Sequence, residues 1–481
     1  MVVNSINFWI FFLAVLVLYF SVCRKSKQAQ NILLLIASYV FYGIAEWKMI
    51  PILLAATAIF YGIGIWISNN NKDNSKKASI LTTVGVVMGV GLLVYFKYLN
   101  FLIDEFSNLF NLIGLHTNPS TFKIVMPLGI SFFTFKLISY VVEVHRENID
   151  VCKDPIAFGT YVAFFPTIMS GPIDRPNQFL PQLEKNREFD YDNAAEGARR
   201  IVWGMFLKMC IADRISGYTD AVFGNYMQHN ATSIVIAGIL YAFQMYTDFC
   251  GYSHMAIGVS QIMGLKVREN FNRPFLAQNM AEYWRRWHMS LTSWLTDYVF
   301  MPLNLAFRNW GKWGLYLATV LNLVIVGFWH GANWTYGLFG LYHGLLLVAV
   351  TACEKKRKKF EKQHQLKDKW FWKYPRIIMT FLLASFGLMI FRSESVGDFF
   401  GTVARLGSGF SAPFLDLGCL GYSIPFILLL IFKEWKDENK KNISLLHSGK
   451  TWVRLVTFSV FVLIILLTGE LNGGSFIYFQ F

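Results

Sequence analysis

The sequence predicts an all-α, polytopic membrane protein, and three features support this fold class. The 481 residues are 54% hydrophobic and 17% aromatic but only 15% charged, whereas a soluble domain carries about a quarter charged residues. Many apolar runs approach the roughly 20 residues that a helix needs to cross a bilayer. The alternating segments of about ten residues that indicate a membrane β-barrel are missing. We therefore expect roughly 11 or more transmembrane helices, with re-entrant or interfacial helices around a central funnel.

Candidate membrane spans follow one another along the chain. The first apolar run has no basic residue before it and Arg24 after it, which is the reverse of a cleavable signal peptide, so we expect it to be retained. Shorter apolar pieces at 200–212, 254–265 and 291–306 are expected to be re-entrant or interfacial. The expected spans cover residues 6–22, 31–47, 50–68, 79–97, 124–142, 156–173, 232–249, 315–330, 334–352, 375–391, 415–432 and 452–468.

The formal charge of +14 is carried by short basic clusters between the apolar runs. Cytoplasmic loops of membrane proteins carry an excess of Lys and Arg, so the clusters predict topology and contact with the lipid bilayer rather than nucleic-acid binding. Placing them in the cytoplasm puts the N-terminus and the C-terminus on the extracytoplasmic side. The clusters lie at residues 24–27, 72–77, 355–369 and 433–441.

The regular succession of spans breaks up between residues 144 and 310. Polar residues lie among aromatic ones here, and Gly251-Tyr252-Ser253 is expected to interrupt a helix. Irregular backbone at membrane depth needs protein or a water-filled cavity around it, so we expect this region to line a cavity. We treat residues 1–481 as one domain, with N-terminal helices at 1–123, a catalytic core at 124–352, and C-terminal helices with an aromatic tail at 353–481.

Histidines in apolar sequence are the strongest candidates for chemistry, because an ionisable side chain in a membrane span costs roughly 2.5 kcal/mol or more. His330 ends the apolar run 321–330, and Gly331 beside it lets another group approach the backbone closely. A neutral buried imidazole suits general-base catalysis; the alternative is a core histidine that bonds a backbone carbonyl. His343 is either a packing residue or one that supports the site indirectly.

His288 is the second candidate and lies in the segment Tyr283-Trp-Arg-Arg-Trp-His288. On a continuous helix, Arg285, His288 and Thr292 would form one polar stripe. Trp284 would lie one turn before His288 on such a helix. The alternative is an interfacial anchor, in which Trp and Arg side chains hold the helix at the level of the lipid headgroups.

Metal sites and familiar nucleophile motifs are not indicated. The histidines show no HxxxH, HxH or HExxH spacing, so we expect no metal. The six cysteines are scattered without a CxxC pair and are expected to be free thiols. The lack of a GxSxG motif and of a P-loop argues against a lipase-type serine and against ATP binding.

Several sequence blocks together resemble the membrane-bound O-acyltransferase (MBOAT) superfamily, most closely its bacterial polysaccharide O-acetyltransferase branch. The resemblance covers roughly residues 5 to 350 well and the C-terminal third loosely. Cys250 and His254 stand where the branch typically has Ser and Asp, and Asn304-Leu305 replaces its usual Gly-Gly. The blocks are Pro127-Leu-Gly-Ile-Ser-Phe-Phe-Thr-Phe135, Phe165-Pro166 with Ser170-Gly-Pro-Ile173, Tyr246-Thr-Asp-Phe-Cys-Gly-Tyr-Ser253, Glu269-Asn-Phe271, Trp284-Arg-Arg-Trp-His-Met-Ser-Leu291, Asp297-Tyr298 with Met301-Pro-Leu303, and Trp329-His-Gly-Ala332.

The resemblance implies a multi-pass O-acyltransferase of the bacterial cytoplasmic membrane, with His330 as the catalytic histidine and His288 as the second active-site histidine. The implied reaction moves an acyl group, expected to be acetyl, from a cytoplasmic thioester such as acetyl-CoA to an extracytoplasmic hydroxyl. That hydroxyl belongs to an envelope polysaccharide or to a protein that relays the group, and no bound cofactor is implied. Supporting or substrate-binding roles are expected for Trp284, Arg285, Trp329, Asp248, Tyr252, His343 and Tyr478.

Other functions remain open at this point. A transporter or flippase of an acylated lipid or glycan would also need a polytopic cavity, although the chain has no visible internal repeat. A scaffold for an external acyltransferase would bind no acyl donor. The aromatic tail Phe476-Ile-Tyr-Phe-Gln-Phe481 is either an interfacial belt or a segment that folds back into the outer mouth of the cavity, with the Tyr478 hydroxyl as a transient acyl acceptor.

Overall fold

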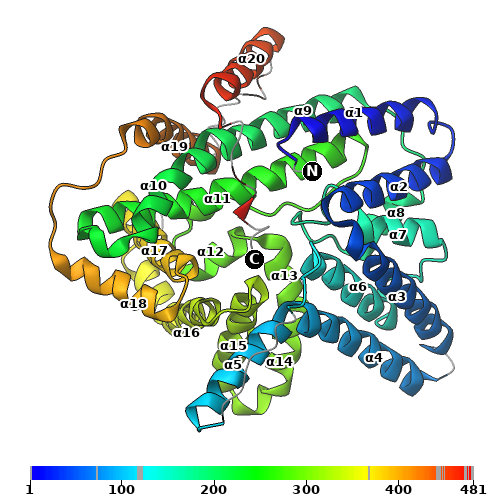
Figure 1. The fold of residues 1–481 in the computed structure, drawn as a ribbon, viewed down its shortest axis with the longest axis horizontal. Helices are drawn as coiled ribbons and strands as arrows, with labels where there is room; N and C mark the ends of the chain where they lie inside the picture. The colour runs from blue at the N-terminus through cyan, green and yellow to red at the C-terminus, as the bar shows by residue number, and fades with distance from the viewer. Residues whose placement is uncertain are drawn as a thin grey trace. The chain divides into compact units, whose positions relative to one another are not determined.

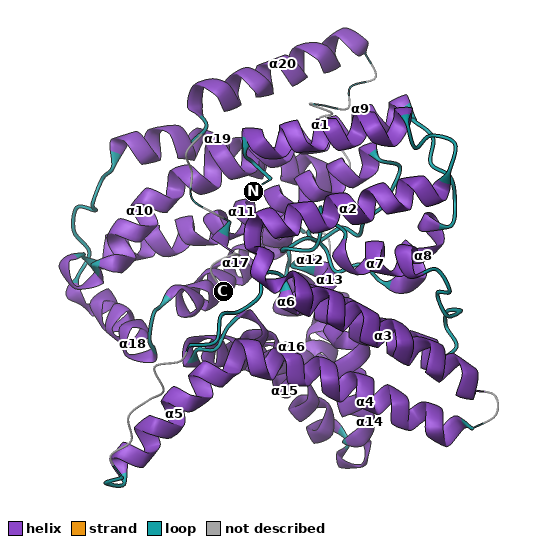
Figure 2. Ribbon diagram, turned by 45° about the vertical axis from the view of Figure 1, so that its right-hand side comes forward, coloured by secondary structure: helices purple, strands orange, loops and turns teal. Residues whose placement is uncertain are grey.

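The structure is a computed structural model. In the part of the chain that it describes, the fold consists of helices joined by turns and loops. Regular secondary structure in these residues consists of helices, and none of them forms a strand (Figure 2). The predicted all-α class is therefore confirmed. The described residues are 3–71, 74–115, 123–366, 369–439, 446, 448, 450–470, 474 and 476–477.

Contacts between residues group the chain into two compact units. The first unit comprises Met1–Ile201 and Met255–Arg268. The sequence-based division at residues 123 and 352 stays a prediction. The first unit contains α1 (Ile6–Ser21), α2 (Lys27–Glu46), α3 (Ile50–Asn71), α4 (Ser75–Leu93), α5 (Leu99–Leu112), α6 (Ile130–His145), α7 (Pro155–Ala163) and α8 (Pro176–Leu183), and it shares α9 (Tyr191–Met205) and α11 (Ala231–Ile262) with the second unit.

Glycines allow close helix packing in the first unit, where α3 and α4 lie against α6 (Figure 1). A Cβ atom at Gly64 of α3 would collide with the Tyr140 ring of α6, and one at Gly89 of α4 would collide with Ile138. Small residues at such positions let helix backbones approach one another, as in membrane helix pairs. Nearly every side chain of α6 is consequently buried.

The second unit comprises Val202–His254 and Glu269–Phe481. Its π-helical turn η3 (Phe206–Ala212) joins α9 to α10 (Asp213–Gly224) without a loop. The other helices of this unit are η4 (Tyr226–Gln228), η5 (Pro274–Leu276), α12 (Met280–Arg286), α13 (Met289–Leu295), η6 (Thr296–Phe300), α14 (Met301–Ala306), η7 (Arg308–Trp310), α15 (Lys312–His330), α16 (Trp334–Gln363), α17 (Trp370–Arg392), α18 (Val396–Arg405), η8 (Leu406–Ser408), α19 (Leu417–Glu438) and α20 (Thr451–Thr468).

A tightly packed hairpin of α15 and α16 carries His330 at its turn (Figure 1). A Cβ atom at Gly327 would collide with the carbonyl of Tyr336, and one at Gly340 would collide with the carbonyl of Leu323. The two helices therefore touch backbone to backbone, and this contact fixes where the end of α15 lies. Asn333 begins α16, because its side chain accepts a hydrogen bond from the backbone N–H of Thr335.

Eight helical segments of the described chain are long and apolar enough to cross a bilayer. Many of their apolar side chains are exposed, such as Leu463 and Leu467 of α20, which suits a lipid environment. The predicted span 6–22 appears as the shorter apolar helix α1. The eight segments are Lys27–Asn71, Ser75–Leu112, Ala231–Ile262, Lys312–His330, Trp334–Gln363, Trp370–Arg392, Leu417–Glu438 and Thr451–Thr468.

Two local predictions were wrong. Residues 156–173 do not form one helix, because α7 ends at Ala163 shortly before Pro166, whose ring disfavours helical backbone at the preceding residue. Gly251-Tyr252-Ser253 does not interrupt a helix either, and α11 runs unbroken through it. Gly251 instead lets α11 approach the backbone carbonyl of Gly204 closely. Gly251 therefore allows close packing of the backbone and does not end the helix.

Candidate active site

His288 lies between two short helices rather than on a continuous one. The Asn279 side chain accepts a hydrogen bond from the backbone N–H of Glu282 and so begins α12, which ends at Arg286. His288 has φ 44° and ψ 51°, the left-handed conformation, and α13 begins after it. The predicted stripe of Arg285, His288 and Thr292 on one helix was therefore wrong. A non-glycine residue in this conformation costs roughly 1–3 kcal/mol and is typical of functional sites.

The cause of this break is Asn270, a buried residue outside both helices. Its carbonyl accepts a hydrogen bond from the backbone N–H of Met289 (2.8 Å). Its side-chain Oδ1 accepts from the Ser290 hydroxyl (2.7 Å) and backbone N–H (3.3 Å), and its Nδ2 donates to the Ser253 hydroxyl (3.2 Å). Asn270 thus ties the residues that directly follow His288 to α11.

His288 and His330 form a buried pair. Their ring centroids are 6.5 Å apart, and only 1% of His288 and 5% of His330 are exposed. The Trp329 ring lies against both, with centroids at 5.7 Å from His288 and 5.0 Å from His330. Phe249 covers His288 from another direction at 4.7 Å. Burial lowers the pKa of His288 to about 3, so its imidazole is neutral at physiological pH.

His343 lies apart from this pair, in aromatic packing. Its ring contacts Trp284 (5.2 Å) and Phe339 (4.5 Å), and its Nε2 faces Gly387 of α17, where no Cβ atom would fit. Phe339 also contacts His330 at 6.4 Å, so it lies between the two histidines. This placement agrees with the packing alternative for His343.

Arg285 is exposed, whereas Trp284 beside it is buried. The guanidinium of Arg285 lies close enough to Glu354 of α16 to interact with it electrostatically. The adjacent Arg286 forms ion pairs with Glu282 (2.6 Å) and Glu438 (2.8 Å). Arg285 therefore lies near the basic end of α16.

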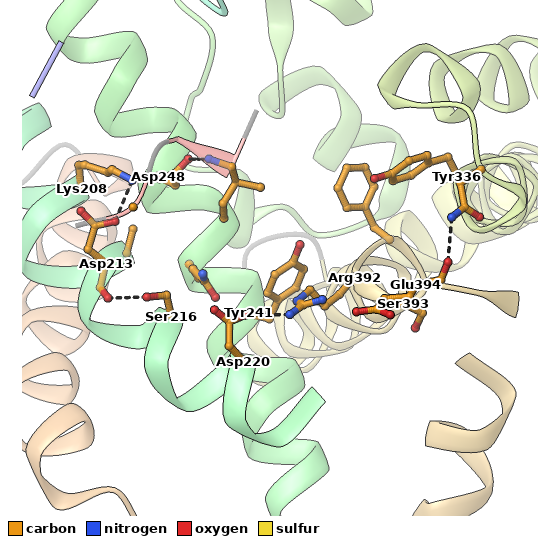
Figure 3. Close-up of a pocket in the computed structure, with 16 residues that line it drawn as sticks. Lys208, Asp213, Ser216, Asp220, Tyr241, Asp248, Tyr336, Arg392, Ser393 and Glu394 are labelled. Atoms are coloured by element: carbon orange, nitrogen blue, oxygen red, sulfur yellow. Dashed lines mark hydrogen bonds and ion pairs between the residues drawn. The ribbon is translucent and has the colours of Figure 1, made fainter. Parts of the chain in front are cut away.

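A polar cavity of about 440 Å³ lies near the pair, and Asp248 lines it. The Asp248 carboxylate accepts from the Lys208 ammonium at 2.6 Å, and Asp213 accepts from the same ammonium at 2.8 Å. Figure 3 shows these three side chains together, with Arg392 and Asp220 facing one another elsewhere in the cavity. Burial lowers the pKa of Lys208, but the two carboxylates raise it above its ordinary value overall, so Lys208 stays charged.

The C-terminal tail contacts this cluster. The backbone N–H of Ile477 donates to Asp248 at 2.9 Å, and the Phe476 ring lies 4.5 Å from the Lys208 ammonium. Phe476 also packs against Tyr252, one helical turn after Asp248 on α11. Asp248 and Tyr252 thus both contact the tail. Tyr478, the expected acceptor, lies outside the described residues.

A single aromatic layer separates the cavity from His330. Phe391 and Tyr336 line the cavity, and their ring centroids are 4.8 Å apart. The Phe391 ring also lies 5.1 Å from the His330 imidazole. Gly331 makes room for this layer, because a Cβ atom there would collide with the Tyr336 ring. The group that was expected to approach the backbone closely at Gly331 is therefore the Tyr336 ring.

Several residues of this region were not anticipated from the sequence. Lys208 could have been recognised from the sequence, because it is an ionisable residue in the apolar piece 200–212. In the structure it lies in the π-helical turn η3, and such turns are frequent at functional sites. Nothing in the local sequence marks Asn270 as functional, apart from its position in the block Glu269-Asn-Phe271. The other unanticipated residues are Asp213, Asp220, Tyr241, Arg392 and Glu394.

Comparison with known proteins identifies the family of the chain. The model of the membrane-bound O-acyltransferase (MBOAT) family matches residues 149–391. Probable alginate O-acetylase AlgI of Pseudomonas syringae pv. tomato is 34% identical over 388 residues, 80% of this chain and 71% of that protein. Peptidoglycan O-acetyltransferase of Helicobacter pylori is 28% identical over 369 residues, 70% of this chain and 67% of that protein.

A third relative, teichoic acid D-alanyltransferase of Bacillus subtilis, is 34% identical over 275 residues, 56% of this chain and 69% of that protein. The prediction of an acyltransferase is thereby confirmed over the transporter alternative. Because both buried histidines fall inside the matched region and the identity extends over most of the chain, the protein belongs to the membrane-bound O-acyltransferase family and is a multi-pass membrane O-acyltransferase.

Proposed function

We propose that this enzyme transfers an acetyl group from a cytoplasmic thioester, acetyl-CoA, to an extracytoplasmic hydroxyl of an envelope polysaccharide or of a protein that relays the group. The observation that carries the proposal is the buried pair of His288 and His330 inside the family-matched region. A thioester carbonyl placed between two rings 6.5 Å apart would be within reach of both.

In the proposed reaction, His330 accepts the proton of the attacking hydroxyl while the hydroxyl oxygen bonds to the thioester carbonyl carbon. Neutral His288 donates a hydrogen bond to the developing oxyanion, which is worth roughly 3–4 kcal/mol for one such donor. The carbon–sulfur bond then breaks, and the His330 imidazolium returns its proton to the leaving thiolate. The products are an oxygen ester and a free thiol, and no bound cofactor takes part.

The proposed sidedness follows from α16 and α17. Asn333 and Tyr336 at the start of α16 line the polar cavity, as does Arg392 at the end of α17, while the basic cluster 355–369 joins the opposite ends of these helices. The 30 residues of α16 extend about 45 Å, enough to cross a bilayer. If the basic cluster is cytoplasmic, the cavity faces outward and suits the acceptor.

The donor is proposed to enter from the opposite, basic side. Arg285 is exposed there and lies near Glu354, next to the cluster 355–369. The phosphates of a coenzyme thioester carry negative charge, so cationic side chains on this side would raise its local concentration. Trp284 and Trp329 would then shape the path toward His288.

The His330→Ala variant tests this proposal. We expect purified His330→Ala protein to keep its thermal unfolding temperature and to lose transfer of labelled acetyl from acetyl-CoA to isolated envelope polysaccharide. A loss of roughly 10²–10⁴-fold is typical of a missing general base. His229→Ala, which changes a histidine in a different part of the same unit, should behave as the unchanged protein. Transfer that survives in His330→Ala would refute the assignment.

Tyr478 is proposed as a transient acceptor on the outer side. Its support is chain connectivity, since the preceding residue Ile477 lines the cavity and binds Asp248. Tyr478→Phe should then abolish delivery of acetyl groups to the external polymer. Unchanged acetylation of the polymer in Tyr478→Phe would remove Tyr478 from the pathway without affecting the role of His330.

A further inference from the structure

The lining of the polar cavity carries more acids than bases. Four carboxylates border it, from Asp213, Asp220, Asp248 and Glu394, against the two cations of Lys208 and Arg392. Burial raises the pKa of Asp213 to about 7, so this group is partly protonated at neutral pH. The acids outnumber the bases even when Asp213 is neutral. An anionic ligand would therefore be repelled by this cavity.

The same lining offers hydrogen-bond acceptors. Asp213 Oδ2 is buried without a hydrogen-bond partner among the described residues, and the side chain of Asp213 is only 7% exposed. In its ionised form this carboxylate accepts hydrogen bonds and cannot donate them, so it suits a ligand with hydroxyl donors. An unsatisfied buried oxygen costs about 1–3 kcal/mol, which a bound hydroxyl would offset.

Aromatic and amide groups complete the lining. Tyr241, Tyr336 and Phe391 are the aromatic residues of the lining, and Gln244 and Asn333 are its amide residues. A cavity with several apolar faces and a few convergent polar groups is typical of small-ligand sites, and its volume of about 440 Å³ lies in their usual range. Phe391 also touches His330, so a ligand here is one ring away from the proposed base.

We propose that this cavity binds the acceptor and selects an uncharged, hydroxyl-rich glycan over a carboxylate- or phosphate-bearing one. The inference rests on the proposed acyl transfer and adds the chemical class of the acceptor to it. Glu394 is the residue best suited to testing this selectivity by mutation. Its side chain is exposed at the rim, and its backbone carbonyl accepts from the Asn333 amide, so a change of side chain leaves that contact intact.

The test uses two soluble acceptors with the same hydroxyl groups: tetragalacturonate, and its methyl ester, in which the carboxylates are blocked and the charge is removed. Purified protein in detergent is given labelled acetyl-CoA with each acceptor, and kcat/KM is measured for ester formation. We expect the neutral methyl ester to be preferred roughly tenfold or more at low salt, with a smaller preference at high salt because ions screen the carboxylates.

The Glu394→Lys variant should reduce this preference by roughly threefold to tenfold, since it reverses one charge at the cavity. Glu354→Lys is the matched control, because it makes the same change on α16 at the end away from the cavity, and it should keep the original preference. Equal use of both acceptors by the unchanged protein would overturn the inference. A preference unaffected by Glu394→Lys would overturn the assignment of selectivity to this cavity.

Thioester cleavage without acceptor separates this inference from the proposed function. If acetyl-CoA is cleaved but neither tetramer is esterified, the glycan assignment is overturned and the proposed donor chemistry stands. If the purified protein does not consume acetyl-CoA even in incubations long enough to reveal slow hydrolysis, the proposed donor chemistry itself fails. Ester formation thus tests the glycan assignment, and consumption of acetyl-CoA in the same assay tests the proposed donor chemistry.

Discussion

Phe391 lies between the His330 imidazole, 5.1 Å from its ring, and the polar cavity that Phe391 itself lines. An acceptor hydroxyl that comes from the cavity must therefore pass this ring to reach the proposed base. Because the ring lies between the cavity and His330, it should keep cavity water from the imidazole. Exclusion of water protects a reactive thioester from hydrolysis, so the ring should couple cleavage to transfer.

Phe391→Leu should uncouple these two events. Leucine keeps the site apolar but removes the flat ring, so we expect acetyl-CoA hydrolysis without acceptor to rise several-fold while transfer per thioester cleaved falls. Free thiol and ester product measured in parallel give the ratio. Phe386→Leu, on the same helix but packed against Tyr342 and Phe399, is the control and should leave the ratio unchanged. An unchanged ratio in Phe391→Leu would show that the ring does not seal the site.

Asn270 should act as a positioning residue for His288. Replacing it by alanine removes the bonds that its side chain makes with Ser253 and Ser290, at a cost of about 1–3 kcal/mol in unfolding free energy. Displacement of His288 by about 1 Å should lower kcat roughly 10²-fold with little change in the KM for acetyl-CoA.

Two further variants separate positioning from stability. Asn270→Asp keeps an acceptor for Ser290 and should recover part of kcat, whereas Ser253→Ala removes only one bond and should keep most of it. A kcat that follows thermal stability across all three variants, rather than the Ser290 contact, would argue for a purely structural role of Asn270.

The histidines could be predicted from the sequence, whereas the turn that presents His288 could not. His330 stands at the end of an otherwise apolar run, and the cost of an ionisable group in a membrane makes it conspicuous. The segment before His288 contains neither Gly nor Pro, so its local pattern favours a continuous helix. The break is imposed by Asn270, eighteen residues away, and tertiary contacts of this kind leave no local signal.

The polar cavity escaped prediction for a different reason. Asp220 and Arg392 look in sequence like ordinary charges at the ends of membrane helices, and only the meeting of α10 with α17 makes them a pair. Lys208 could have been found, because the rule that selected His330 applies to it equally. Its counter-charges on α10 and α11 could not, since their spacing along the chain shows no pattern.

Lys208 should be required for stability in this cluster. Lys208→Met leaves the carboxylates of Asp213 and Asp248 without their shared cation, and breaking a buried pair in this way costs about 3–5 kcal/mol. The double variant Lys208→Met/Asp248→Asn should recover part of this loss, because one of the two uncompensated charges is removed. Thermal unfolding in detergent measures both effects.

The matched control for Lys208 is Lys433→Met, which breaks a partly exposed ion pair with Asp437 on α19 and a cation–π contact with Trp203, and it should cost only about 0.5–1.5 kcal/mol. Lys208→Met should also loosen the tail, since Phe476 contacts the ammonium. Faster trimming by carboxypeptidase would report this. Equal stability losses in Lys208→Met and Lys433→Met would contradict the buried cluster.

The pH dependence of stability should report the burial of His288. Its pKa is about 3 in the folded protein against about 6.5 when exposed, so the unfolded state binds more protons between these two values. Stability is then fully present above pH 6.5 and is lost as pH falls toward 3. At pH 4.5 the loss from this one group is about 2–3 kcal/mol.

His288→Asn should remove that component, because asparagine tolerates the left-handed conformation and does not titrate. The difference in unfolding free energy between the unchanged protein and His288→Asn should therefore shrink by about 2–3 kcal/mol between pH 7 and pH 4.5. Other titrating groups are common to both proteins and cancel in this difference. His229→Asn serves as the control for loss of a histidine in general. A difference independent of pH would mean that the His288 imidazole is accessible to protons in the folded enzyme, and its role as a neutral hydrogen-bond donor would then fail.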